Sequence, residues 1–383
     1  MRICFLCSDY PPGPHGGIGT MTRVLGRALV EAGHQVRVAG VYPPSYPAPD
    51  RHSTDGIEVW RLREPTSPGG FVRARYALWK LVSGWVNRGE IDIVEAPDYE
   101  GWIAFWPRLA VPVMVRLHGS AGYFAAEMGQ PLPPLLSWLE RHALLRADAW
   151  ISVSRYTAEK TQALYTLPNP PAAILYNPVE TGAAVPAAGS RSHDVVFSGT
   201  LVEKKGVIPL IQAWPAVRTA VPGAVLHMYG KEGRTADGQA MTAFLRGMLP
   251  EAAAESVVFH GHVTREHLFT MLGEAGAAVF PSFAEAFAIA PLEAMTCGIP
   301  TVYSTRGSGP ELIEHGVDGM LVDPGEPAQI SDALIGLLCD TEGARRMGEA
   351  GRRKIVEQFS MRAILPQNVA FYEQMIAKHG RRR

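Results

Sequence analysis

Short apolar runs rich in β-branched residues alternate with helical patterns along almost the whole chain. This alternation constrains the fold most strongly, because strands separated by helices join into parallel sheets of βαβ units. In the first half we expect strands at residues 3–7, 36–41, 57–62, 91–95, 111–117 and 150–153. In the second half we expect them at 195–198, 225–229, 257–260, 277–281, 301–304 and 320–322. The pattern predicts an α/β fold with doubly wound parallel sheets.

A break in this pattern divides the chain into two domains. The 383 residues suit two domains at roughly 150 residues each. The stretch 179–193 is small, polar and interrupted by Pro and Gly, without helical or strand periodicity. We therefore predict two facing Rossmann-like domains, 1–180 and 181–362, with a ligand cleft between them at the carboxyl ends of the strands. A last helical segment, 363–383, is expected to return to the first domain.

Composition and charge exclude several classes of protein. Hydrophobic residues make up 47% and charged residues 19%, which is typical of a globular chain rather than a disordered one. The formal net charge of −1 gives no overall attraction for nucleic acid or for an anionic membrane, and leaves open only a local patch of charge. Residues 101–117 are too interrupted by Pro and Arg to span a membrane, and residues 3–7 are too short for a signal peptide. We therefore expect a cytoplasmic protein.

The four cysteines are too few for a disulfide framework. Cys4 and Cys7 form a CxxC, but they lie in an expected strand, where residues three apart point to opposite faces. The pattern favours two small buried residues over a redox or zinc site.

Two glycine- and lysine-bearing loops are candidates for holding a phosphate. Gly16 and Gly17 lie between the first strand and a helix, where backbone N–H groups can approach an anion. A dinucleotide motif needs a third Gly that is missing here, so nicotinamide binding is disfavoured. In the second domain, Lys204 and Lys205 precede a helix N-terminus, where the helix dipole disfavours cations. A bound anion explains that conflict, and a solvated pair of charges is the alternative.

The sharpest signal is the segment 281–295, PSFAEAFAIAPLEAM, which joins a strand to a helix. Glu285 lies in the loop and Glu293 lies early in the helix, within an otherwise apolar stretch. Buried carboxylates need partners, and each offers two acceptor oxygens to the vicinal hydroxyls of a ribose or a sugar. The N–H groups of residues 287–290 could hold a pyrophosphate between them.

Taken together, these motifs resemble those of the retaining glycosyltransferases of family 4, also called the group 1 family, which have the two-domain GT-B fold. The resemblance covers nearly the whole chain. It rests on the Gly16–Gly17 pair, on His118–Gly119 after a strand, and on the Glu-x7-Glu pair. It also includes the segments at 139–157, 176–180, 198–206, 257–263 and 307–311.

The resemblance implies a role for each matching residue. Glu293 would bind the ribose hydroxyls, Glu285 the donor sugar, and Lys205 the diphosphate. The amides of Gly16, Gly17, Phe287, Ala288, Ile289 and Ala290 would surround phosphate and sugar. Val263 would flank the base and His118 the transferred sugar, so that His118, Lys205 and Glu285 form the catalytic set.

The implied activity is metal-independent transfer of a hexose from a nucleoside-diphosphate sugar to an acceptor hydroxyl. The donor is a co-substrate, with a UDP- or GDP-sugar favoured, and no cofactor is expected. The acceptor, a glycan, a lipid-linked sugar or a small molecule, is left open. Two residues depart from the family pattern: Thr200 stands at the usual Arg and Ala288 at the usual Gly. Lys204 or Arg306 could replace the missing cation.

Other residues carry weaker functional interpretations. His260, His262 and His267 resemble a metal cluster, with His260 and His262 expected on one strand face, but a base-flanking strand end is favoured. Asp98 is expected to cap the helix that follows it.

The segment 71–88 mixes aromatic and basic residues. We expect its aromatics to pack inward and its cations to point outward. Peripheral contact with the inner face of a membrane, or binding of the acceptor, is the alternative.

Two other functions compete with transfer. A nucleotide-sugar epimerase can share the architecture and would need no acceptor. A nucleotide-sugar-binding protein with weak or no catalysis is supported only by Thr200.

Overall fold

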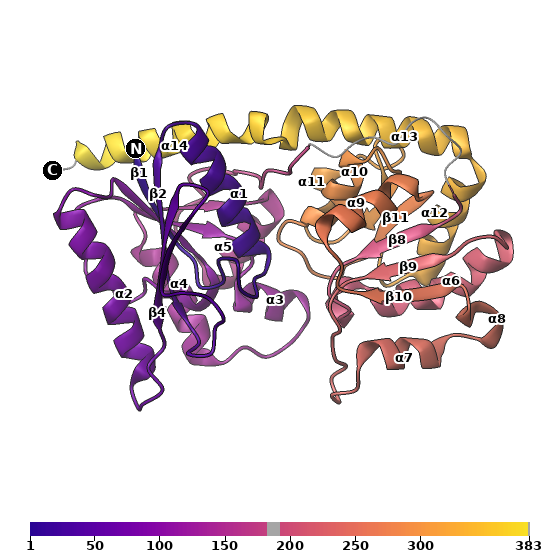
Figure 1. Cartoon of the computed structure of the whole chain (residues 1–383), viewed down its shortest axis with the longest axis horizontal. Coiled ribbons are helices and arrows are strands. Elements are labelled where there is room, and N and C mark those ends of the chain that lie inside the picture. Colours follow the sequence, from indigo (N-terminus) through magenta and orange to yellow (C-terminus); the bar gives the residue numbers. More distant parts are fainter. Residues whose placement is uncertain (182–191, 382–383) are drawn as a thin grey trace. The chain divides into compact units, whose positions relative to one another are not determined.

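The computed structural model describes residues 1–181 and 192–381, which form two compact units. Unit 1 contains Met1–Pro178 and Met361–Arg383, and unit 2 contains Val179–Ser360. The final helix α14 (Met361–Gly380) thus belongs to unit 1, although it follows unit 2 in the sequence (Figure 1). Most of the expected linker, residues 182–191, lies outside the described part of the chain.

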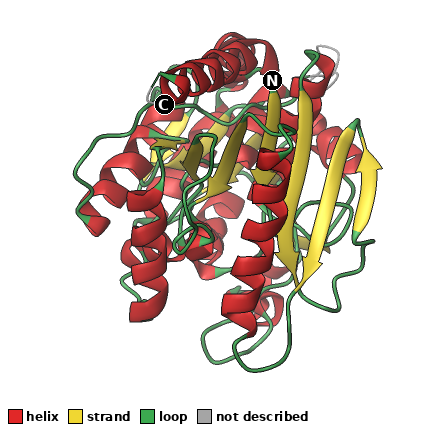
Figure 2. Cartoon of the chain, turned by 90° about the vertical axis from the view of Figure 1, so that its left-hand side faces the viewer, coloured by secondary structure: helices red, strands yellow, loops and turns green. Residues whose placement is uncertain are grey.

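Unit 1 is built on a seven-stranded sheet in the order β3-β4-β2-β1-β5-β6-β7 (Figure 2). All neighbours pair in parallel except β3 with β4. The strands are β1 (Arg2–Leu6), β2 (Gln35–Tyr42), β3 (Arg51–Thr54), β4 (Ile57–Arg63), β5 (Ile93–Pro97), β6 (Val113–Leu117) and β7 (Ala149–Ser152). The sequence gives no apolar signal for β3, whose four residues are Arg, His, Ser and Thr. Pairing with β4 holds this edge strand, and the Arg51 guanidinium lies 3.4 Å from the centre of the Trp60 ring.

Helices cover both faces of this sheet. They are α1 (Gly17–Glu31), α2 (Gly70–Asn87), α3 (Ala121–Glu127), α4 (Pro134–Arg146), α5 (Arg155–Tyr165) and α14, with a 3-10 turn η1 (Tyr99–Gly101). Strand alternation supplies the two layers of core: Cys4 and Leu6 pack in one cluster, and Ile3 and Cys7 in the other. The predicted opposite orientation of Cys4 and Cys7 is therefore confirmed. Both thiols are free and buried, and burial raises the pKa of Cys4 to about 12.

Unit 2 has a six-stranded parallel sheet in the order β10-β9-β8-β11-β12-β13. The strands are β8 (Val195–Ser198), β9 (Leu226–Tyr229), β10 (Val257–Gly261), β11 (Ala277–Phe280), β12 (Thr301–Ser304) and β13 (Met320–Val322). The helices are α6 (Val207–Ala220), α7 (Met241–Met248), α8 (Glu251–Ala254), α9 (Arg265–Glu274), α10 (Ile289–Thr296), α11 (Gly309–Leu312), α12 (Pro327–Cys339) and α13 (Thr341–Lys354). A 3-10 turn η2 (Glu203–Lys205) precedes α6, and a π-helical turn η3 (Ile355–Phe359) follows α13.

The expectation for α2 is wrong in part. Trp85 packs inward as expected, but Phe71 and Tyr76 are exposed and Arg75 is buried. The Arg75 guanidinium lies between aromatic rings, 3.5 Å from the centre of Phe71 and 4.5 Å from that of Trp102. It also donates to the Glu100 carbonyl at 2.6 Å. A buried arginine is tolerated where ring faces and a carbonyl replace its water.

No helix in residues 1–181 or 192–381 is long and apolar enough to cross a bilayer.

Candidate active site

Two of the predicted motifs meet in unit 2 because their strands are neighbours. β8 and β11 pair in parallel, so the loops that follow Ser198 and Phe280 leave the same edge of the sheet. The first loop carries Thr200 and Lys205, and the second carries Glu285 before α10. This shared edge explains how residues about eighty positions apart in the sequence come into contact.

Lys205 and Glu285 form a close ion pair across these two loops, from Nζ to Oε1. Ser282 Oγ donates to the same carboxylate oxygen at 3.3 Å. Gly206 ends the turn η2 with φ at +71°, and a Cβ there would lie 1.7 Å from the Pro281 carbonyl oxygen. Glycine is therefore required for the lysine loop to pass so close to the second loop.

Glu293 lies in the second turn of α10 and pairs with Arg265, the first residue of α9, with Nε 3.1 Å from Oε1. The same guanidinium pairs with Glu180 through Nη1 and packs over Phe269. Burial raises the pKa of Glu293, and the charge of Arg265 opposes that shift. Sequence reasoning missed Arg265. A cation at a helix N-terminus, the signal used for the lysine pair, could have found it.

The start of α10 faces the same loops. Ala288 is its N-cap residue and no side chain caps the helix. The amides of Ile289 and Ala290 therefore have no acceptor within the helix and can donate to a ligand, whereas Pro291 has no N–H. Phe287 and Ala288 are buried, while Ile289 and Ala290 are partly exposed.

The other predicted donor-side residues lie around this edge. Thr200 is exposed, and Val263 follows β10 and is partly buried. Of the cations considered as replacements for the missing arginine, Arg306 pairs with Asp323 at 3.0 Å. Burial lowers the pKa of Lys204, and the charge of Glu285 opposes that shift.

The expectation that His260 and His262 share a strand face is wrong. β10 ends at Gly261, whose φ of +70° turns the chain before His262. His260 instead stacks on Tyr229, with ring centres 4.3 Å apart, and its Nε2 lies 2.9 Å from His227 Nδ1. Among the described residues, no three His, Cys, Asp or Glu side chains are arranged to hold a metal ion.

In unit 1, Gly16 and Gly17 begin α1, and His118 directly follows β6. The Gly16 amide donates to Asp9 Oδ2 at 2.8 Å, so a carboxylate of this chain accepts from one of the two glycine amides. Burial lowers the pKa of His118 to about 3, and the nearby charge of Arg116 adds to the shift. The imidazole is therefore neutral at physiological pH.

The expectation that Asp98 caps a helix is wrong. Its side chain makes no capping bond to η1; Oδ1 instead accepts from the His118 amide at 2.9 Å. Oδ2 is buried without a hydrogen-bond partner, and burial raises the pKa of Asp98 to about 7. Asp98 thus fixes the backbone of His118, the residue that directly follows β6.

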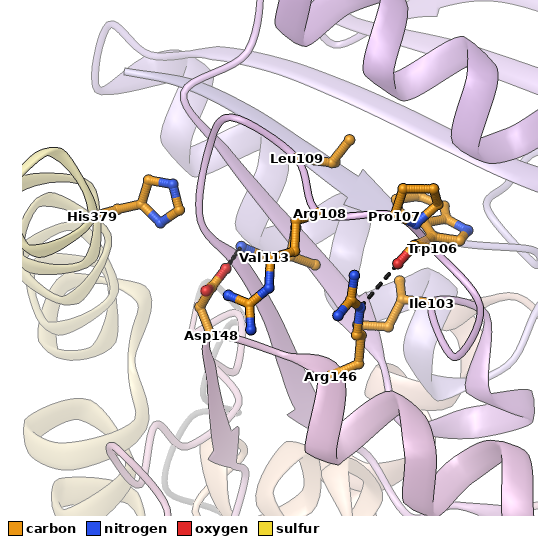
Figure 3. Close-up of a pocket in the computed structure, with 9 residues that line it drawn as sticks. All are labelled: Ile103, Trp106, Pro107, Arg108, Leu109, Val113, Arg146, Asp148 and His379. Atoms are coloured by element: carbon orange, nitrogen blue, oxygen red, sulfur yellow. Dashed lines mark hydrogen bonds between the residues drawn. The ribbon is translucent and has the colours of Figure 1, made fainter. Parts of the chain in front are cut away.

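A cavity of about 40 Å³ lies at the opposite edge of the unit 1 sheet, where β6 and β7 begin (Figure 3). Arg146 Nε donates to the Trp106 carbonyl there, and Asp148 Oδ2 accepts from the Val113 amide, both at 2.9 Å. Because β6 separates this cavity from His118, the cavity is not part of the candidate site.

Comparison with known proteins identifies the family. The family described as "Glycosyl transferases group 1" matches residues 183–354, and "Glycosyltransferase Family 4" matches residues 15–183. The two matches meet at the division between the units and together cover both candidate loops. The chain belongs to the family 4, or group 1, glycosyltransferases.

Similar proteins that match nearly all of this chain agree with the assignment. A glycogen synthase from Mycobacterium tuberculosis is 27% identical over 100% of this chain and 96% of its own. A GDP-mannose-dependent alpha-(1-6)-phosphatidylinositol monomannoside mannosyltransferase from the same organism is 26% identical over 94% of both chains. The solved sucrose-phosphate synthase from Thermosynechococcus elongatus superposes with a TM-score of 0.79 at 21% identity, covering 98% of this chain and 99% of that one. The GT-B fold expected from the sequence is confirmed.

Proposed function

We propose that this glycosyltransferase moves a hexose from a nucleoside-diphosphate sugar to an acceptor hydroxyl and retains the anomeric configuration. The observation that carries the proposal is the contact between Lys205 and Glu285 at the edge where α10 presents Glu293. The lysine and the uncapped helix N-terminus suit a diphosphate, and the two carboxylates suit hydroxyl groups on either side of it. A nucleoside-diphosphate sugar has this arrangement. The relative named as GDP-mannose-dependent supports a nucleotide sugar as the donor class.

Each group in unit 2 has a distinct task in this proposal. Glu293 accepts the ribose hydroxyls and Glu285 those of the donor sugar. Lys205 and the amides of residues 287–290 bind the diphosphate, while Val263 flanks the base. The Lys205–Glu285 ion pair orients both side chains before the donor arrives, which lowers the cost of ordering them on binding.

His118 and the Gly16–Gly17 loop belong to unit 1, and we propose that they contact the transferred sugar. A pKa of about 3 keeps the His118 imidazole neutral, so it would act as a hydrogen-bonding group and not as a cation. We propose a front-face reaction without a protein nucleophile. Negative charge develops on the leaving diphosphate, where Lys205 and the dipole of α10 supply preorganised stabilisation. No metal is required for this step.

A thermal-shift screen with UDP, GDP, ADP and TDP tests the donor site and names the base. A ligand at a hundredfold excess over its dissociation constant stabilises the native state by about 2.7 kcal/mol. We expect one nucleotide series to raise the melting temperature, with and without EDTA. Glu293→Gln should abolish that shift, whereas Glu266→Gln, on exposed α9 surface, should leave it intact.

Transfer itself is tested with the sugar of the nucleotide that binds. Release of nucleotide that depends on an added acceptor, with an unchanged anomeric configuration in the product, is the expected result. An altered donor sugar without any acceptor would identify an epimerase. Binding without turnover would identify a nucleotide-sugar-binding protein.

A further inference from the structure

The outer face of α4 carries an apolar stripe that is left exposed by the elements in residues 1–181 and 192–381. Leu135, Trp138 and Leu145 are 63%, 41% and 41% exposed. With His142 they recur at intervals of three, four and three residues, which places all four on one side of the helix. Phe105, from the turn after η1, is 52% exposed and extends the stripe, its ring centre 5.4 Å from that of Trp138. The Trp138 and His142 rings stack with their centres 3.7 Å apart.

Cations border this stripe. On a helical wheel Arg141 and Arg146 fall on its two sides. Arg108, three residues after Phe105, is exposed and lines the cavity of Figure 3 together with Arg146. The Nε of Arg146 donates to the Trp106 carbonyl (Figure 3), and that of Arg141 to the Tyr165 carbonyl at 3.0 Å. These bonds fix both guanidinium groups beside the stripe. Glu140, the single acidic residue of α4, is fully buried and accepts from the amides of Ala121 and Gly122 at 3.0 Å.

We propose that this α4 face, composed of Phe105, Leu135, Trp138 and Leu145 with Arg108, Arg141 and Arg146, docks onto the surface of an anionic lipid bilayer. An apolar stripe with a central tryptophan suits the boundary between headgroups and acyl chains. The bordering arginines reach anionic headgroups from the same depth. The surface thus combines the two contributions that interfacial binding needs.

The charge pattern separates this partner from the other candidates. A two-fold dimer through the α4 face would place the same arginines from both copies at one interface, where like charges repel. A nucleic acid would meet an apolar stripe where it needs polar contacts. For the segment 71–88, which forms α2, the sequence offered membrane contact only as the alternative to inward packing. In α2 the exposed Phe71 stacks on the buried Arg75, whereas the exposed side chains of α4 form a stripe with arginines beside it.

Sedimentation with lipid vesicles tests the proposal on the full chain. We expect the protein to bind vesicles of phosphatidylcholine and phosphatidylglycerol in equal parts, and to bind phosphatidylcholine alone far less. Leu145→Ser should reduce partitioning about tenfold, and the double variant Leu135→Ser/Leu145→Ser should reduce it further. Arg108→Glu should weaken binding to the anionic vesicles and leave the weak binding to neutral ones unchanged.

The matched control is Val356→Ser, which removes an aliphatic side chain of similar exposure (48%) from unit 2. The four substituted side chains, those of Arg108, Leu135, Leu145 and Val356, are all exposed. The variants should therefore keep the unfolding temperature of the parent protein. Failure to bind either kind of vesicle would overturn the proposal. So would binding that neither Leu145→Ser nor Arg108→Glu changes, or a dimer in analytical ultracentrifugation that Leu145→Ser dissociates.

Discussion

At the scale of single residues, the most informative feature is a set of three ionisable groups, buried or partly buried, in segments that follow strands. Asp98, His118 and Glu293 each have a pKa moved toward the neutral form by burial. Two of these groups have a defined partner: Asp98 accepts from the His118 amide, and Glu293 pairs with Arg265. Such shifts accumulate at sites that must bind or move charge, and all three residues lie at the edges that carry the candidate site.

Asp98→Asn should remove a pH dependence of stability. Because the folded pKa of about 7 exceeds the ordinary value of 3.8, folding favours the protonated acid. Its contribution is complete below about pH 4 and is lost as the pH rises through about 7. Asn resembles the protonated acid and retains an acceptor for the His118 amide. The free energy of unfolding of the parent protein should therefore fall between about pH 4 and pH 7 more than that of the variant, as measured by urea titration. Equal slopes would assign the dependence to other groups.

Arg265→Gln should weaken nucleotide binding about tenfold and make it more sensitive to acid. The Arg265 charge lowers the pKa of Glu293 against the effect of burial, so its removal raises that pKa further. The ionised carboxylate, the better acceptor for ribose hydroxyls, is then lost at a higher pH. Calorimetric titration with the nucleotide over a range of pH measures the shift.

Two substitutions serve as controls for the arginine. Arg265→Lys should recover part of the affinity. Arg23→Gln removes a similarly exposed arginine of unit 1, whose partner is Asp55, and should leave the pH profile unchanged. A profile that Arg265→Gln does not move would rule out the positioning of Glu293 by Arg265.

At the scale of elements, neighbouring strands decide which loops meet. β8 lies beside β11, so the lysine loop and the glutamate loop contact each other, and Phe283 N donates to the Lys204 carbonyl at 2.8 Å. The two loops approach each other at Gly206, where an added Cβ would lie nearer to a neighbouring atom than at any other glycine in the described residues.

Gly206→Ala should therefore disrupt the donor site. Its φ of +71° already disfavours a side chain, and the added Cβ would meet the Pro281 carbonyl oxygen, which is backbone and cannot rotate away. We expect a loss of about 1–3 kcal/mol in stability and a loss of the nucleotide-induced thermal shift. Gly238→Ala, also at positive φ but with open space around it, is the control for conformational strain alone. Retention of the shift in Gly206→Ala would show that the close approach of the loops is dispensable.

At the scale of the whole molecule, a buried polar network fastens α14 to unit 1. Arg116 and Glu95 are buried and form a bidentate pair at 2.7 and 3.0 Å. From α14, Asn368 Oδ1 accepts from Arg116 at 2.7 Å, and the Tyr372 hydroxyl donates to Glu95 at 2.8 Å. A buried pair that loses its additional partners is strongly destabilised.

A chain ending at Ser360 should consequently lose stability in unit 1, although the deletion follows unit 2 in the sequence. We expect the unfolding of unit 1 to shift down by several kcal/mol, on the order of the 3–5 kcal/mol cost of breaking a buried pair. The nucleotide-induced shift, which reports on unit 2, should persist. Calorimetry with and without nucleotide separates the two effects, and Gln367→Ala is an exposed control on the same helix. Unaltered unfolding of the shortened chain would contradict the role of α14.

The sequence by itself determined the architecture and located the two loops that meet at the candidate site. Periodic apolar runs specify parallel strands and helices because burial depends on local spacing. Twelve of the thirteen strands in the described part of the chain follow from this pattern. Local chemistry likewise indicated the Glu285–Glu293 pair and Lys205. The polar edge strand β3 escaped prediction because only its pairing with β4 holds it.

Only the tertiary structure decided which charged groups meet. Arg265 and Glu293 are joined by packing of α9 and α10, and Asp98 turned to the His118 amide instead of capping its own helix. The exposure of the α4 stripe likewise depends on which side of the helix the sheet covers. These contacts depend on elements distant in the chain, and local propensity carries no information about such partners, because their energies arise only when the sheet brings them together.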